Sequence, residues 1–230
     1  MNLLLFDIDG TLLNTSGAGA RSMLAAGRDL YGERFTDDGV EYAGRLDPLI
    51  IAEMFHASGV SRDLYEVDRF RRRYLELLHL ELSTRPAGAC PGVHDLLAAL
   101  SPTSATMGVL TGNFFESGAM KLRSCGIDPD AFRIRVWGDE SPRATPKRAD
   151  LVEVALERWG VMTGIAPRSD RVIVIGDTPG DVECARAHGC RSLAVTTGKY
   201  ARGALEAAGA DLVLKDLSET QRVTEFLLRG

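Results

Sequence analysis

Long apolar runs are missing from this sequence of 230 residues, as are several other features that mark particular classes of protein. No stretch approaches the length that a membrane-spanning helix needs, so we expect no contact with a membrane. No block of basic residues stands out and the net charge is -5, which argues against a nucleic-acid partner. The four cysteines show no Cys-x-x-Cys spacing, which argues against a zinc site and favours free thiols in a reducing compartment.

A leader pattern is also missing, because the first predicted strand begins almost directly after Met1. We therefore expect a cytoplasmic protein. The composition, 45% hydrophobic and 26% charged, is that of an ordinary globular protein. The length suits one large domain or a domain with an insertion, and the choice between a monomer and a homodimer stays open.

The most informative stretch is residues 3–11. Leu3 to Phe6 form a continuous apolar run, which is typical of a parallel strand buried on both faces. Asp7 and Asp9 follow at its carboxyl end, the edge at which open α/β sheets bind ligands. Two carboxylates this close repel each other unless a cation or a proton compensates. Mg²⁺ prefers such oxygen ligands, and a carboxylate can also act as a nucleophile.

The chain divides into a helical part and an alternating part. Helical periodicity without a convincing strand extends over residues 18–83, and strands alternate with helices beyond the Pro- and Gly-rich segment 86–92. The alternation predicts an α/β fold with a doubly wound parallel sheet, and the first strand has to pair with strands beyond the helical part. The predicted domains are a discontinuous Rossmann-like core, residues 1–14 and 88–230, and an inserted all-helical domain, residues 15–87.

Polar residues also follow two later apolar strands. Thr111 and Gly112 come after one of them, where a hydroxyl and backbone N–H groups can hold a phosphate, although a Thr at this place also caps helices. Asp177 and Asp181 flank a tight turn after the other strand, in the segment Gly176-Asp177-Thr178-Pro179-Gly180-Asp181.

One basic residue precedes a predicted helix. Lys147 lies just before the helix that begins at Asp150, with Arg143 and Arg148 as basic neighbours that could take its place. A Lys in such a position is most often solvated surface, so its meaning depends on the other segments.

In this order, the segments resemble the four motifs of the haloacid dehalogenase (HAD) superfamily of phosphohydrolases. The motifs are Asp7-Ile8-Asp9-Gly10-Thr11, Thr111, Lys147, and Gly176 to Asp181. The helical insertion directly after the first motif resembles the phosphoglycolate phosphatase-like branch. The resemblance implies a HAD-like core with a helical cap, and a Mg²⁺-dependent phosphatase that acts on a small phosphorylated metabolite.

The resemblance also implies a role for each motif residue. Asp7 would attack the phosphorus and form an aspartyl-phosphate, while Asp9 would act as the general acid and then as the general base. The implied Mg²⁺ ligands are Asp7, the backbone carbonyl of Asp9, Asp177 and Asp181. The implied phosphoryl ligands are Thr111, Gly112 and Lys147. In the cap, Arg45 would bind an anionic leaving group, or else it is a surface residue beside the helix start at Asp47.

Three other functions compete with a phosphatase. A phosphomutase would share every core residue and differ in its cap and substrate. A dehalogenase of the same superfamily lacks the second acid, so Asp9 argues against it. A non-catalytic protein that binds a phosphorylated metabolite should have lost a catalytic residue, and none is obviously missing.

Overall fold

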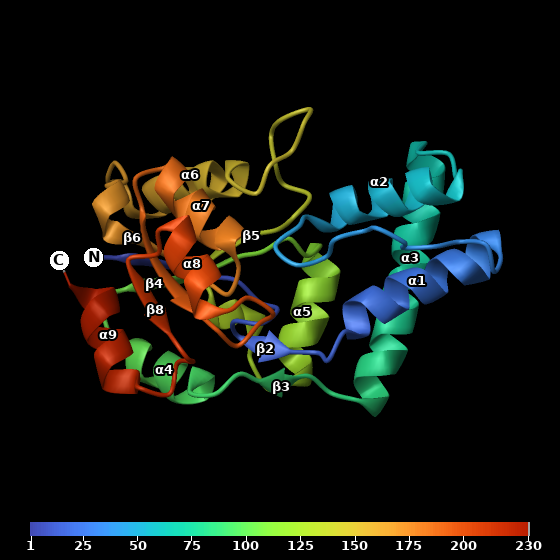
Figure 1. The fold of residues 1–230 in the computed structure, drawn as a ribbon. Helices are drawn as coiled ribbons and strands as arrows, with labels where there is room; N and C mark the ends of the chain where they lie inside the picture. Colours follow the sequence, from blue (N-terminus) through green and yellow to red (C-terminus); the bar gives the residue numbers. More distant parts are fainter. Residues whose placement is uncertain (230) are drawn as a thin grey trace.

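The computed structural model describes residues 1–229, and its centre is the first strand, β1 (Leu3–Phe6). This strand lies inside a six-stranded parallel sheet with the order β5-β4-β1-β6-β7-β8. It pairs with β4 (Thr106–Leu110) on one side and with β6 (Val172–Gly176) on the other. The predicted α/β fold class with a doubly wound parallel sheet is therefore confirmed (Figure 1).

The remaining elements of the sheet layer follow in regular alternation. The outer strands are β5 (Ile134–Val136), β7 (Arg191–Val195) and β8 (Leu212–Leu214). The helices are α4 (Val93–Leu100), α5 (Phe115–Ser124), α6 (Asp150–Thr163), α7 (Pro179–Ala187), α8 (Arg202–Ala208) and α9 (Thr220–Leu228). Two short 3-10 turns are Pro129–Ala131 and Ser169–Arg171.

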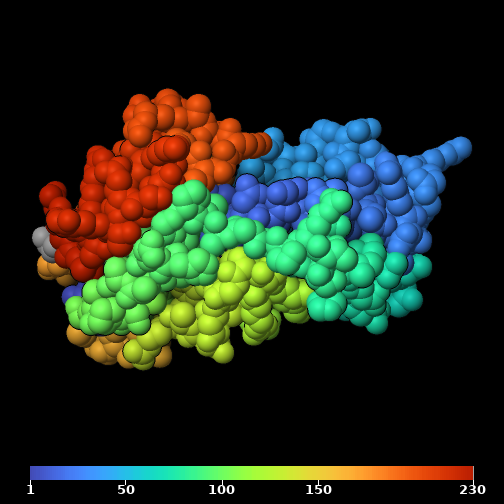
Figure 2. Space-filling model, turned by 90° about the horizontal axis from the view of Figure 1, so that it is seen from below, coloured from blue at the N-terminus to red at the C-terminus, as the bar shows by residue number. Residues whose placement is uncertain are grey.

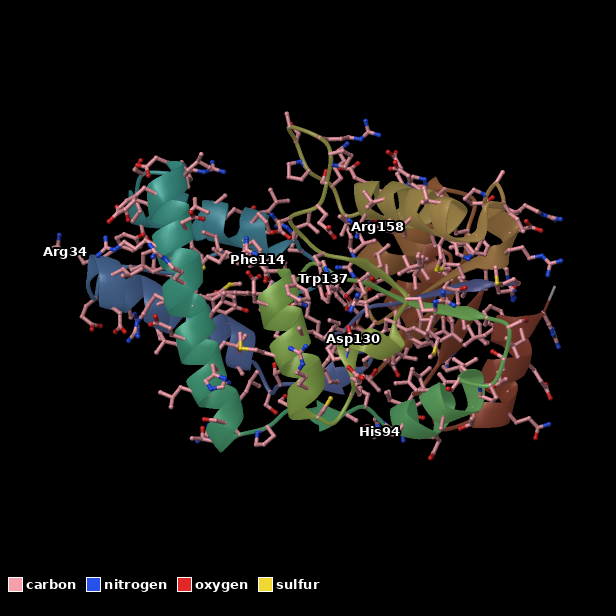
Figure 3. The ribbon with its side chains drawn as sticks, turned by 180° about the vertical axis from the view of Figure 1, so that it is seen from behind. Arg34, His94, Phe114, Asp130, Trp137 and Arg158 are labelled. Carbon is pink, nitrogen blue, oxygen red and sulfur yellow. The ribbon has the colours of Figure 1, made fainter. Side chains whose placement is uncertain are left out.

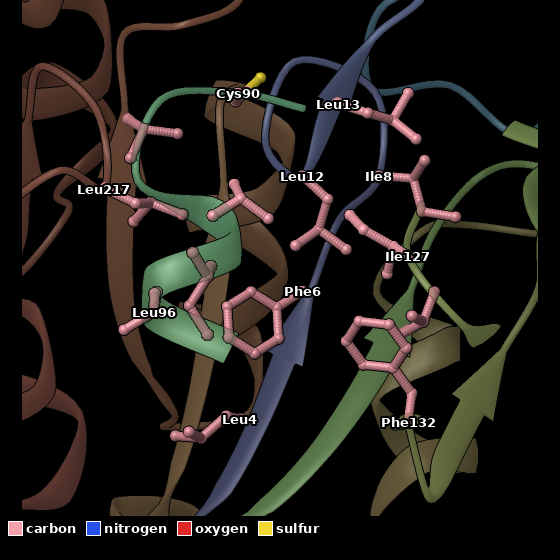
Figure 4. Packing of buried hydrophobic residues seen from close by; sticks show 14 of the residues in the cluster. Leu4, Phe6, Ile8, Leu12, Leu13, Cys90, Leu96, Ile127, Phe132 and Leu217 are labelled. Carbon is pink, nitrogen blue, oxygen red and sulfur yellow. The ribbon is translucent and has the colours of Figure 1, made fainter. Parts of the chain in front are cut away.

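Helices cover both faces of the sheet, which explains why β1 is apolar at every position. Leu4 and Phe6 pack in one cluster with residues of α4, α5 and α9, and Figure 4 shows Phe6 beside Leu96 of α4. Leu3 and Leu5 point to the other face and pack with residues of α6 and α7. Successive side chains of a strand face opposite sides, so a strand covered on both sides has no polar position to offer.

Three helices inserted between β1 and β4 form a separate hydrophobic cluster. They are α1 (Ala18–Tyr31), α2 (Asp47–Ser58) and α3 (Leu64–Thr84), hereafter the insert helices. Aromatic side chains such as Phe55 and Phe70 fill the space between them. Figure 2 shows the blue-to-teal insert helices at one end of the molecule and the red C-terminal elements at the other.

Two short strands join the insert helices to the sheet layer. β2 (Leu13–Asn14) and β3 (Gly88–Ala89) pair antiparallel. The chain therefore enters the insert and comes back to the sheet layer through two adjacent segments. Runs of two residues are too short to produce a strand pattern in the sequence. The helix α8 was missed as well, because only Leu205 of its seven residues is buried. None of the helices within residues 1–229 is both long and apolar enough to cross a membrane.

Candidate active site

A cavity of about 520 Å³ lies at the carboxyl ends of β1, β4 and β6, beneath the insert helices. Asp7 and Asp9 line it from the segment after β1, Thr111 from the segment after β4, and Asp177 from the segment after β6. The parallel sheet brings these segments together because all three strands end at the same edge. The sequence motifs therefore converge on one cavity, with Lys147 as the exception.

Three buried carboxylates gather at the carboxyl ends of β1 and β6. Oxygen atoms of Asp7, Asp177 and Asp181 lie within 4.8 Å of one another, and each residue is at most 6% exposed. Burial raises the pKa of Asp7 to about 6, against the opposing effect of Arg148. Burial together with the charges of Asp7 and Asp181 raises the pKa of Asp177 to about 8. Each charged carboxylate therefore needs a compensating cation.

Local structure holds this cluster in place. Asp181 lies in the first turn of α7, where its Oδ2 accepts from the backbone N–H of Thr178 at 3.0 Å and from the Thr178 hydroxyl at 2.7 Å. This reciprocal capping fixes the rotamer of Asp181. Asp177 fits only because two neighbours are glycines: a Cβ on Gly10 would lie 2.5 Å from its Oδ2, and one on Gly198 would lie 1.6 Å away.

The cation beside the carboxylates is Arg148 rather than Lys147. One guanidinium nitrogen of Arg148 donates to Asp7 Oδ1 at 2.7 Å and to Asp181 Oδ1 at 2.6 Å. Lys147 is exposed and does not line the cavity; its backbone N–H donates to Asp150. Lys147 and Arg148 are adjacent in the sequence, but their side chains point in different directions, and only that of Arg148 reaches the carboxylates. The expectation that Lys147 reaches the site is therefore corrected to Arg148.

Arg148 also carries a donor that nothing satisfies. Its Nε is buried and has no hydrogen-bond partner within residues 1–229. Burial alone would lower the pKa of Arg148, but the charges of Asp181 and Asp7 raise it above its ordinary value, so the group stays charged. A buried charged donor without a partner is costly, which points to an acceptor that the protein itself does not supply.

Asp9 lies in a different environment from Asp7. Its Oδ2 accepts from Lys121 Nζ at 2.7 Å and from Asn113 Nδ2 at 2.8 Å, and its side chain is 40% exposed. Lys121 belongs to α5 and is almost completely buried, and its Nζ also donates to Asn113 Oδ1 at 2.6 Å. The sequence reading missed Lys121, because a Lys in a helix gives no signal that it points inward.

Thr111 and Gly112 line the cavity beside this pair. Thr111 is fully buried, and its hydroxyl accepts from Asn113 Nδ2 at 2.8 Å. The Gly112 carbonyl accepts from the backbone N–H of Asp47 at 2.7 Å, and a Cβ on Gly112 would lie 1.9 Å from the Arg45 carbonyl oxygen. Gly112 is thus a point of close approach between the insert and the segment after β4.

Arg45 and Asp47 lie on the insert side of the cavity. Arg45 lines the cavity, but its guanidinium pairs with Glu53 of α2. Asp47 is buried, and its Oδ2 accepts from the backbone N–H of Phe114 at 3.0 Å and from the Ser117 hydroxyl at 3.2 Å. Asp47 therefore caps the start of α5 rather than its own helix; Figure 3 shows Phe114 at this junction. Burial raises the pKa of Asp47 to about 6.

The chemistry of the carboxylate cluster fits a hard divalent cation. All the donors are oxygen atoms, which Mg²⁺ prefers over nitrogen or sulfur. Three carboxylates and one guanidinium leave a formal charge that a divalent cation would balance. Asp7, Asp177 and Asp181 are the residues that could hold it.

Comparison with known proteins agrees with this geometry. A family model described as haloacid dehalogenase-like hydrolase matches residues 4–195. A phosphoglycolate phosphatase of Pectobacterium atrosepticum is 25% identical over 92% of this chain and 87% of its own length. An N-acetylmuramic acid 6-phosphate phosphatase of Pseudomonas aeruginosa is 29% identical over 86% of this chain and 83% of its own.

Solved structures agree on the fold. CbbY from Rhodobacter sphaeroides, in complex with phosphate, superposes with a TM-score of 0.74 at 21% identity, over 95% of this chain and 96% of its own. At this identity the likeness concerns the fold alone. The family model covers most of the chain, and the resemblance predicted from the motifs is confirmed. The chain belongs to the haloacid dehalogenase-like hydrolases.

Proposed function

We propose that this enzyme is a Mg²⁺-dependent phosphatase that hydrolyses a small phosphomonoester through an aspartyl-phosphate on Asp7. The observation that carries the proposal is the buried cluster of Asp7, Asp177 and Asp181 beside Arg148, whose Nε has no partner within residues 1–229. A phosphoryl group next to Asp7 would offer that Nε an oxygen acceptor. Phosphoryl transfer depends mainly on positioning and on neutralising phosphate charge, and this cluster is built for both.

The chemical roles follow from the two aspartates. The Asp7 carboxylate attacks the phosphorus as the bond to the leaving oxygen breaks, and Asp9 gives that oxygen its proton. Asp9 then takes a proton from the water that attacks the phosphorus of the aspartyl-phosphate, which releases phosphate and restores Asp7. Asp9 suits proton transfer because it reaches the cavity while Lys121 and Asn113 hold its Oδ2.

The remaining residues bind and orient the phosphoryl group. The Thr111 hydroxyl and the Arg148 guanidinium face the same cavity as Asp7 and would contact the phosphoryl oxygens. Mg²⁺, held by Asp7, Asp177 and Asp181, with the backbone carbonyl of Asp9 as the fourth ligand that the family implies, would neutralise charge on those oxygens. We assign Arg148 the role first predicted for Lys147.

The insert helices serve as a cap in this proposal, with residues 15–87 as the cap domain and residues 1–14 and 88–230 as the core. Segment 42–47 lies directly against the core, where Gly44 approaches Thr178 and Asp47 bonds to Gly112. A cap this close excludes bulk water and limits the substrate to a small molecule. The two curated relatives named above bear the names of phosphate esters that also carry a carboxylic acid, and we propose the same class here.

The test is release of inorganic phosphate from a panel of small phosphomonoesters, with Mg²⁺ or with excess chelator. We expect release with Mg²⁺ only, and none from an Asp7→Asn control. Undiminished release in chelator would contradict the metal assignment. Conversion of a sugar phosphate into an isomer without release of phosphate would instead identify a phosphomutase.

A further inference from the structure

Beyond Asp9, the cavity wall contains hydrogen-bond donors that the proposed chemistry does not use. Lys121 has three N–H donors, of which one bonds to Asp9 Oδ2 and one to Asn113 Oδ1. The third has no partner within residues 1–229. Because Lys121 lines the cavity, this third donor is available to a ligand there.

Tyr74 of α3 provides a second free donor. The residue is fully buried and lines the same cavity, yet its hydroxyl has no hydrogen-bond partner in the described chain, residues 1–229. A buried polar group without a partner destabilises the fold, so its presence here points to a partner that arrives from outside. Burial and the nearby charge of Asp47 raise the pKa of Tyr74 well above its ordinary value, so the hydroxyl keeps its proton and can donate it.

The first turn of α1 supplies further donors. Its N-cap is Gly17, which has no side chain to bond the first N–H groups, and no acidic residue occupies the first turn. Gly19 and Ala20 line the cavity, and in residues 1–229 no acceptor bonds their backbone N–H groups. The start of a helix attracts negative charge for this reason.

These three sources of donors face one point. A Cβ on Gly19 would lie 3.3 Å from Lys121 Nζ and 3.7 Å from the Tyr74 hydroxyl. The glycine therefore leaves room for a small group between the ammonium and the hydroxyl. Arg45, the residue first expected to bind an anion, is instead occupied by Glu53.

We propose that Lys121, Tyr74 and the first turn of α1 form a subsite that binds a carboxylate on the leaving group of the substrate. The proposal rests on the proposed function and names the residues that select this substrate class. Every group at the subsite donates, which matches a carboxylate, because a carboxylate only accepts. Lys121 already pairs with Asp9, so the charge left for a ligand is small and suits the single charge of a carboxylate better than the double charge of a second phosphate.

The acidic neighbours do not block such a ligand. Asp9 turns its Oδ2 toward Lys121 and Asn113, and Asp47 turns its Oδ2 toward Phe114 and Ser117. Since Asp9 would also serve the leaving oxygen, the carboxylate would lie only a short carbon chain away from the ester bond.

The test compares 2-phosphoglycolate with ethyl phosphate, in which a methyl group replaces the carboxylate. Calorimetry on the Asp7→Asn protein with Mg²⁺ measures binding without turnover. We expect 2-phosphoglycolate to bind at least about tenfold more tightly, since charge-assisted hydrogen bonds are among the strongest in proteins. Equal affinities for the two esters would overturn the subsite.

Two further variants connect the preference to these residues. Adding Tyr74→Phe should reduce the preference several-fold, because only the hydroxyl is lost. Adding Gly19→Ala should reduce it too, because its Cβ would lie 3.3 Å from Lys121 Nζ and fill part of the space. The matched control is Tyr31→Phe, whose hydroxyl bonds to Glu66 away from the cavity. A preference that survives both Tyr74→Phe and Gly19→Ala would contradict the assignment.

Failure of the subsite differs from failure of the proposed function. Phosphate release by the wild-type protein from carboxylated and neutral esters at the same kcat/KM would overturn the subsite and leave the phosphatase intact. No release from any ester, with a clear binding preference for 2-phosphoglycolate that Tyr74→Phe weakens, would overturn the phosphatase and support the subsite.

Discussion

Asp7 and Asp9 are two residues apart at the end of β1, but they face two regions of one cavity with opposite electrostatics. Around Asp7, the carboxylates of Asp177 and Asp181 outnumber the single guanidinium of Arg148. Around Asp9, the ammonium of Lys121 and the amide of Asn113 supply the contacts. The first region calls for a cation, and the second offers donors to an anion or an acceptor.

The difference shows how one short segment can place two carboxyl groups in environments that suit different chemistry. Burial among carboxylates raises the pKa of Asp7, and a bound cation would restore its charge and leave it free to attack phosphorus. Asp9 is partly exposed and held by donors, so it can exchange protons with a leaving group or with water. Variants that change one region at a time should therefore distinguish the proposed roles of nucleophile, acid and metal ligand.

Replacing Asp7, the proposed nucleophile, should have the largest effect. We expect Asp7→Asn to lower kcat by roughly 10⁵-fold, as with other enzymes that lose a nucleophile. The fold should remain, because the change removes one of several crowded carboxylates. Steady-state phosphate release and thermal unfolding without metal measure the two effects; near wild-type turnover would remove Asp7 from this role.

Replacing Asp9, the proposed acid, should cost less activity, and the loss should depend on the leaving group. We expect Asp9→Asn to lower kcat/KM, which covers only the steps up to departure of the leaving group, by roughly 10²- to 10⁴-fold on an alkyl phosphate. An aryl phosphate such as 4-nitrophenyl phosphate should lose less, because its leaving group needs no proton. Equal losses on both substrates would show that Asp9 does not act as the acid.

The third test separates Arg148 from its neighbour in sequence. We expect Arg148→Ala to lower kcat/KM by roughly 10²- to 10³-fold, because a charged donor at the phosphoryl group is lost. The matched control, Lys147→Ala, should keep its activity, since Lys147 is exposed outside the cavity. A loss of activity in Lys147→Ala but not in Arg148→Ala would assign binding of the phosphoryl group to Lys147.

The carboxylate region should make stability depend on pH and on metal. The pKa values of Asp7 and Asp177 are raised from 3.8 to about 6 and about 8, so the fold binds more protons than the unfolded chain. Without metal, stability should therefore fall as the pH rises from about 4, near the unfolded pKa of both groups, to about 8, the folded pKa of Asp177. Mg²⁺ should reverse the loss at high pH. Calorimetric Tm values with Mg²⁺ or chelator measure this; a flat metal-free profile would contradict it.

The smallest effect is expected at Asp47, where the cap meets the core. Its pKa is raised from 3.8 to about 6, so its charge opposes folding above that pH. Asp47→Asn keeps an acceptor for Phe114 and Ser117 and should raise stability at pH 8 by up to about 3 kcal/mol. The gain should vanish at pH 4. Urea unfolding at both pH values measures it, and a loss of stability at pH 8 would mean that the charge itself is needed.

Much of the fold was predictable because the sheet layer obeys local rules. The continuous apolar run of β1 indicated a strand covered on both faces, and the Val- and Ile-rich run before Asp177 indicated β6. The two-residue strands β2 and β3 were missed because pairing, rather than composition, defines them.

The local sequence was enough to predict that Asp7, Asp9, Thr111 and Asp177 meet at one edge, because each follows a strand of a parallel sheet. The tertiary structure decided that Arg148, and not Lys147, turns inward, since the carboxylates of Asp7 and Asp181 that bind it come from other segments of the chain. It also decided the roles open to Lys121 and Tyr74. The local sequence around each residue does not show that its side chain faces the cavity. Only the packing of α3, α5 and α1 brings both side chains close to Gly19.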